Sequence, residues 1–167
     1  MSADPAPAGT RVLVIGVGNP LMSDDGVGQR LLEALAARAT PDDRVEFLDA
    51  GTLGFMLLPR VEQCDGLLAL DAANVGGAPG DLRIFEDEDF DAFVRRPRCS
   101  VHELGLHDLL DAARLMGALP ARRALVGVQP ERLGWGMALS PPVEAALPAA
   151  VEAAASLLER WLAANPR

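Results

Sequence analysis

Residues 11–28, RVLVIGVGNPLMSDDGVG, contain the pattern that decides the fold. The apolar run 12–15 is typical of a buried parallel strand, and a turn rich in glycine ends it. A helical pattern of apolar residues follows over 27–37. A strand, a glycine turn and a helix in this order form a ligand crevice at the carboxyl end of the strand. Because Asp24 and Asp25 line this crevice, we expect it to bind a cation rather than a phosphate.

Strand and helix signals alternate along the rest of the chain. Further strands are expected over residues 45–48, 66–70, 82–85 and 124–128. Helices are expected over residues 53–61, over 100–116, where the Ser100–Glu103 spacing fits a capping box, and from Ser140 onward. Pro141 suits the first helical position, whereas Pro148 is expected to kink or interrupt that helix. Residues 87–98 run from acidic to basic and are expected to be a surface excursion.

This alternation predicts an α/β fold in a single three-layer domain over residues 11–163. We expect a mostly parallel, twisted sheet of about five strands, flanked by helices. Residues 1–10 are not expected to be a signal peptide, because they contain neither its basic start nor its apolar core, and they are expected to form a flexible lead-in. No apolar run approaches the ~20 residues that a membrane helix needs, so no membrane span is expected.

The composition limits the classes of function. The chain has 167 residues and a formal net charge of −9, which disfavours nucleic acid and anionic membranes as partners. It contains no lysine, which excludes Schiff-base chemistry and a Walker-type phosphate loop. Cys64 and Cys99 lack metal-ligand spacing and are expected to be reduced thiols of a cytoplasmic protein.

Three residues far apart in the sequence are expected to meet at one edge of the sheet. Asp25 follows the first strand, Asp71 ends the third, and His102 lies in the first turn of a helix. Strand carboxyl ends and the starts of the following helices share an edge in such a sheet. Two carboxylates and an imidazole form a candidate divalent metal site. Each residue also has a structural interpretation: interaction with a helix dipole, a turn cap and a surface position, respectively.

Several neighbouring residues are better explained by structural roles. Asp24 is predicted to be the N-cap of the helix that follows, with Asp25 as the first helical residue. Asp49 is placed like Asp71, but a structural role is favoured. His107 is predicted to lie on the helix surface or to pack at its edge. Trp135, between two glycines, is a candidate substrate anchor, with core packing as the alternative.

Three familiar functional motifs do not match this sequence. His102 and His107 are five residues apart, so they do not share a helix face as the zincin pair does. The chain has no G-x-S-x-G motif of a nucleophilic serine. The glycines at 16 and 18 begin a dinucleotide fingerprint, but its third position is Leu21, and the adjacent acidic residues would repel pyrophosphate.

The chain resembles the hydrogenase maturation proteases, also called hydrogenase-processing endopeptidases, over nearly all of residues 11–162. The matching segments, in order, are GVGNPLMSDDGVG, LDAGT, ALDAA, SVHELGLHDLL, LVGVQPE and ALSPPVEAAL. The resemblance implies an endopeptidase that removes a C-terminal extension from the large-subunit precursor of a nickel–iron hydrogenase after nickel insertion. That precursor is the implied partner, and nickel presented by it is the implied cofactor, with no organic cofactor.

The resemblance also implies roles for three residues. Asp25, Asp71 and His102 match the positions of the family's metal ligands, and the first of these is often glutamate. We interpret Asp25 and Asp71 as candidate catalytic residues of an aspartyl-type protease, in which Asp25 or the metal activates water or polarises the scissile carbonyl. No residue stands out as a covalent nucleophile. The alternatives are a non-catalytic nickel-binding assembly factor or metallochaperone, and a small nucleotide-binding module.

Overall fold

The computed structural model describes residues 10–52, 54–96 and 101–164, including side chains except those of 101–104. Strands occupy β1 Val12–Val17, β2 Val45–Gly51, β3 Gly66–Ala72, β4 Leu82–Glu86 and β5 Arg122–Val128. The α-helices are α1 Val27–Arg38, α2 Leu58–Val61, α3 Asp87–Val94, α4 Val101–Leu115 and α5 Pro141–Ala164. Two 3₁₀ turns, η1 Ser23–Gly26 and η2 Gly54–Leu57, precede α1 and α2.

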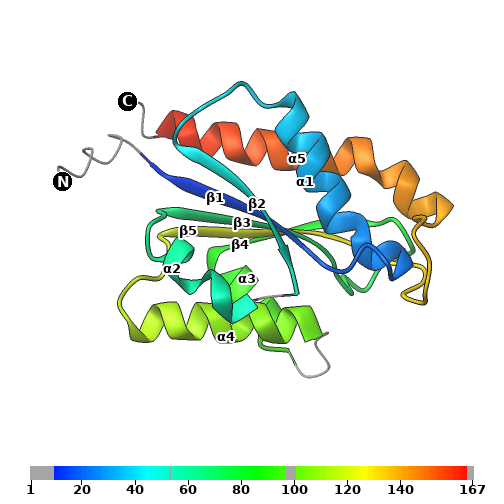
Figure 1. The fold of residues 1–167 in the computed structure, drawn as a ribbon, viewed down its shortest axis with the longest axis horizontal. Helices are drawn as coiled ribbons and strands as arrows, with labels where there is room; N and C mark the ends of the chain where they lie inside the picture. Colours follow the sequence, from blue (N-terminus) through cyan, green and yellow to red (C-terminus); the bar gives the residue numbers. More distant parts are fainter. Residues whose placement is uncertain (1–9, 53, 97–100, 165–167) are drawn as a thin grey trace.

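The strands form one sheet in the order β2-β1-β3-β5-β4 (Figure 1). All neighbours are parallel except β4, which runs antiparallel to β5. Helices α1 and α5 cover one face, and α2, α3 and α4 cover the other (Figure 1). The prediction of a three-layer α/β domain with a mostly parallel five-stranded sheet is therefore confirmed.

The central strands contribute side chains to both faces of the sheet. Val12 and Val14 pack in the core beneath α1 and α5, whereas Leu13 and Ile15 pack on the opposite side. Successive residues of a strand point to opposite faces, so a strand buried on both faces is a continuous apolar run. This is why 12–15 could be recognised from the sequence.

One expectation about helices was wrong, and a second was met only as to one of its two alternatives. Residues 87–94 form α3 rather than a surface excursion, with Phe90, Phe93 and Val94 buried on one side. This i, i+3, i+4 spacing is that of an amphipathic helix, and the acidic residues around Phe90 obscured it. At Pro148 a kink or an interruption was expected; interruption is excluded, because α5 continues to Ala164, and the kink stays a prediction. Within the described ranges, no helix combines the length and apolar character needed to cross a membrane.

Candidate functional site

The segment between β1 and α1 positions Asp25. The chain forms η1 here, with Ser23 at a φ of 53°, an uncommon conformation for a residue other than glycine. Asp25 is partly exposed, and its Oδ2 accepts a hydrogen bond from the backbone N–H of Asn19 at 2.9 Å. The carboxylate is therefore held at the carboxyl end of β1, where a ligand can reach it.

Two glycines let this segment approach the sheet closely. A Cβ atom at Gly18 would lie 1.9 Å from the carbonyl oxygen of Asp25. A Cβ at Gly28 would lie 2.1 Å from the oxygen of Val17 and 2.4 Å from that of Leu70. Only glycine fits such contacts. The glycines therefore bring η1 and the start of α1 against the ends of both β1 and β3.

Asp71 lies at that same edge. It is the penultimate residue of β3, pairs with Gly127 of β5 and has an exposed fraction of 0%. Burial of a carboxylate is costly unless it is paired, hydrogen-bonded or bound to a metal. The predicted placement of Asp25 and Asp71 at one edge of the sheet therefore agrees with the structure.

His102 is in the first turn of α4, but its side chain lies outside the described residues. The first half of α4 packs beside η2, where a Cβ at Gly54 would lie 2.7 Å from the oxygen of Gly105. Because η2 follows β2, this contact places that half of α4 near the carboxyl edge of the sheet (Figure 1). Among the described side chains, no three His, Cys, Asp or Glu residues gather as metal ligands. The complete ligand set thus stays a prediction.

The predicted role of Asp24 as a helix cap was wrong. Asp24 has an exposed fraction of 0%, and α1 begins three residues later, at Val27. Its carboxylate instead accepts four hydrogen bonds from the segment before α5. The donors are the backbone N–H of Ser140 at 2.6 Å, its hydroxyl at 2.8 Å, and the backbone N–H groups of Glu131 at 2.9 Å and Arg132 at 3.0 Å. Asp24 therefore connects η1 to a loop more than a hundred residues away.

This environment changes the acidity of Asp24. Burial alone raises the pKa of a carboxyl group, because it disfavours the charged form. At Asp24 the hydrogen bonds from Ser140, Arg132 and Glu131 outweigh burial and lower the pKa below its ordinary value. Asp24 is therefore a buried anion stabilised by neutral donors.

Gln29 is a polar residue of this edge that the sequence analysis did not single out. Its Nε2 donates to the carbonyl of Gly18 at 2.7 Å and to Oδ1 of Asp49 at 3.2 Å. Asp49 Oδ1 also accepts from the backbone N–H of Gly51 at 2.9 Å, in agreement with its predicted structural role. Gln29 follows Asp25 by one helical turn, and that spacing is the signal that could have identified it.

Other candidates are resolved by their surroundings. His107 Nε2 lies 3.1 Å from Oδ2 of Asp111 along α4, as expected for a residue at the helix surface. Burial raises the pKa of Cys64 to about 12, which makes this thiol a poor nucleophile. Cys99 lies outside the described residues. The side chain of Trp135 is exposed, with an exposed fraction of 83%, so the alternative of core packing was wrong.

A third buried carboxylate, Asp91, lies on the face of the sheet that α3 and α4 cover. Asp91 of α3 receives two hydrogen bonds from Arg123 of β5, both at 2.8 Å, and one from Arg114 at 2.9 Å. Burial acts to raise the pKa of Asp91, but the hydrogen bond and charge of Arg123, with the charges of Arg114 and Arg95, lower it below its ordinary value. This cluster joins α3 and α4 to β5.

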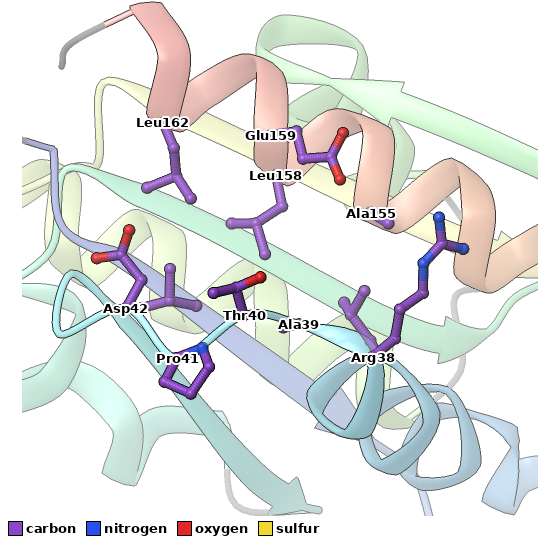
Figure 2. A pocket seen from close by; sticks show the side chains of 11 residues that line it. Arg38, Ala39, Thr40, Pro41, Asp42, Ala155, Leu158, Glu159 and Leu162 are labelled. Carbon is purple, nitrogen blue, oxygen red and sulfur yellow. The ribbon is translucent and has the colours of Figure 1, made fainter.

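A cavity of about 220 Å³ lies between α1, the start of β2 and α5 (Figure 2). Apolar side chains of α1, β2 and α5, including Leu35, Val45 and Leu158, line it. Arg38 and Glu159 lie at its border (Figure 2). Val45 begins β2 and Arg38 ends α1, so the cavity is at the amino edge of the strands, remote from Asp25.

Comparison with known proteins adds a further line of evidence. A family model described as hydrogenase maturation protease, HycI, matches residues 29–157. The hydrogenase 2 maturation protease of Escherichia coli is 42% identical over 159 residues, which are 94% of this chain and 96% of that protein. The hydrogenase expression/formation protein HupD of Rhizobium leguminosarum is 38% identical over 93% of this chain and 77% of its own length.

Solved structures give the same result. The hydrogenase maturating endopeptidase HybD from E. coli superimposes with a TM-score of 0.85 and 41% identity, covering 90% of this chain and 93% of that one. The [NiFe] hydrogenase maturation protease HybD from Thermococcus kodakarensis gives a TM-score of 0.74 and 30% identity, covering 88% and 98%, respectively.

Proposed function

Because the chain belongs to the hydrogenase maturation protease family, we propose that this endopeptidase removes the C-terminal extension of a nickel–iron hydrogenase large-subunit precursor after nickel insertion. The structural observation that carries the proposal is the placement of Asp25 and Asp71 at one sheet edge, produced by the close approach of η1 and α1 to the strands. A peptide segment of the precursor can reach Asp25 there, because its side chain is partly exposed.

Nickel enters the proposal as part of the substrate. Asp25, Asp71 and His102 supply two carboxylates and one imidazole, a donor set that suits a divalent metal of this kind. Bound nickel would act as a Lewis acid that polarises an oxygen atom. A buried carboxylate at Asp71 fits this set, because metal binding is one of the ways in which the cost of its burial is offset.

The proposed chemistry is hydrolysis of one peptide bond. Asp25, as the more accessible carboxylate, accepts a proton from water as the water oxygen bonds to the scissile carbonyl carbon. The bond to nitrogen then breaks, and the proton passes to the leaving amine. In this proposal the enzyme is of the aspartyl type because the carboxylate of Asp25 acts as the general base. The high pKa of Cys64 favours water over that thiol as the attacking group. A reduced thiol at Cys64 is also what we expect in a cytoplasmic protein.

The test is incubation with purified precursor, with and without nickel, followed by mass spectrometry of the precursor. We expect loss of the C-terminal extension only from the nickel-loaded form. Asp25→Ser, Asp71→Ala and His102→Ala should each reduce processing by at least about 100-fold with the fold retained, and Asp25→Glu should retain part of the activity. His107→Ala, a histidine of the same helix, is the matched control and should process normally.

Two outcomes would contradict the proposal. Normal processing by a folded Asp71→Ala variant would contradict the assignment of Asp71 to the proposed site. Nickel-dependent binding of the precursor without any mass loss would instead favour a non-catalytic metallochaperone.

A further inference from the structure

The loop between β5 and α5 exposes large apolar side chains. Trp135 and Met137 have exposed fractions of 83% and 79%, and Leu21, in the segment before η1, is 48% exposed. The backbone N–H of Gly136, between the first two, donates to the carbonyl of Leu21 at 3.0 Å. We call Leu21, Trp135 and Met137 the apolar platform. Exposed apolar groups gathered in this way mark interaction sites on soluble proteins.

The platform is held by a dense set of hydrogen bonds. Ser23 donates from its backbone N–H to the carbonyl of Gly136 at 2.6 Å and from its hydroxyl to that of Gly134 at 2.8 Å. The backbone bond from Ser23 to Gly136 and that from Gly136 to Leu21 together make a parallel β-bridge between Met22 and Gly136. The four bonds to the Asp24 carboxylate attach both ends of the loop to η1. Trp135 is therefore exposed on an anchored loop.

The platform and the candidate site share one support. Asp25 immediately follows Asp24 within η1, and its carboxylate is held by the turn that precedes Leu21. A polypeptide that extends from Asp25 along this segment would meet Leu21 and the loop that carries Trp135. The platform is thus placed to contact residues next to the scissile bond.

We propose that the platform binds an apolar segment of the precursor next to the scissile bond, and that Asp24 is a positioning residue that holds the platform in register with Asp25. This inference rests on the proposed function and extends it to substrate recognition. An exposed tryptophan held in place loses little conformational freedom on binding, which is the property of an interface anchor.

The test compares two double variants of the full chain. Trp135→Ala/Met137→Ala removes most of the platform, and Leu115→Ala/Met116→Ala removes two exposed apolar side chains, 90% and 60% exposed, at the far end of α4. We expect the platform variant to bind nickel-loaded precursor at least about tenfold more weakly, with the cleavage rate at saturation unchanged. The α4 variant should match the wild type, and both should keep their melting temperature.

The precursor's dissociation constant, measured by calorimetry, tests the role of the platform separately from the proposed protease function. If the wild type cleaves the precursor and the platform variant has an unchanged dissociation constant, the proposed role of the platform in binding is overturned. Binding that depends on the platform but is never followed by cleavage would overturn the proposed function and leave the platform standing. A wild type that neither binds nor cleaves the precursor would overturn both.

The role of Asp24 is tested by combining substitutions. Asp24→Asn should weaken precursor binding in the wild-type background and add much less to it in the platform variant, because both changes act on one contact surface. Fully additive effects, or a fall in the cleavage rate at saturation with unchanged binding, would show that Asp24 does not act through the platform.

Discussion

Asp24 and Asp91 are both buried carboxylates with a lowered pKa, but the two regions stabilise their charge differently. At Asp91 the partners are arginines, and the bidentate contact with Arg123 cancels the charge locally. At Asp24 the four donors are backbone N–H groups and one hydroxyl, which solvate the anion without contributing a formal positive charge.

This difference matches the positions of the two groups. The Asp91 cluster joins α3 and α4 to β5, so its role is to hold these elements together. Asp24 lies next to Asp25 and leaves its negative charge at the edge that we propose receives a cation. A carboxylate held by dipoles rather than by arginine keeps that edge anionic, and such an edge attracts a divalent metal.

The largest effect on stability is expected from Asp91→Ala. This change leaves the guanidinium of Arg123, which is only 9% exposed, without its carboxylate partner. Removal of one member of a buried pair should lower the free energy of unfolding by about 3 kcal/mol. Urea unfolding measures this loss, and Asp91→Leu/Arg123→Met, which removes both charges, is the control that should recover much of it. An unaffected Asp91→Ala would show that solvent replaces the pair.

A smaller loss of stability, by about 2 kcal/mol, is expected from Asp24→Ser. Serine satisfies a single N–H group at a helix N-terminus, but its one short oxygen cannot reach donors from Glu131, Arg132 and Ser140 together. Thermal melting measures the loss. Hydrogen exchange of the residue 131–140 amides should be faster in the variant than in the wild type, whereas exchange in β3 should change much less. A variant with wild-type stability and exchange would restore the simple cap interpretation.

The smallest effect concerns pH. Because the pKa of Asp91 in the folded protein is below its ordinary value of 3.8, the stability it contributes is present above that value and is lost as the pH falls through the folded pKa. The difference in unfolding free energy between the wild type and Asp91→Asn should therefore be largest near neutral pH and should shrink below about pH 4. A difference that is constant over this range would contradict the coupling of Asp91 to the arginines.

The strongest sequence signals concerned elements whose pattern is local. The strand at 12–15 and the helix from Val27 were predicted because an apolar run and a 3.6-residue period are visible within a few residues. Helix α3 was missed, since its short apolar face lies among four acidic residues of 87–91. The antiparallel direction of β4 was also not predicted, because it depends on pairing with β5, in which the partner of Glu86 is Ala124, 38 residues later.

The candidate site shows the same division. The placement of Asp25 and Asp71 followed from the rule that parallel strands end at one edge. The partners of Asp24 are 107–116 residues away in the sequence, and no local pattern reveals them. A residue that fits a cap in sequence was therefore assigned to the wrong contact, whereas the role of His102 stays a prediction.

The two outer strands of the sheet have a consequence for behaviour in concentrated solution. An unpaired strand edge is a template on which another chain can add and start aggregation. Here β2 carries Glu46 and Asp49 and β4 carries Arg83 and Glu86, all of them exposed. A second molecule that extended the sheet would have to bring its own backbone against these charged side chains. Each outer strand thus opposes the edge-to-edge association that a flat apolar strand would invite.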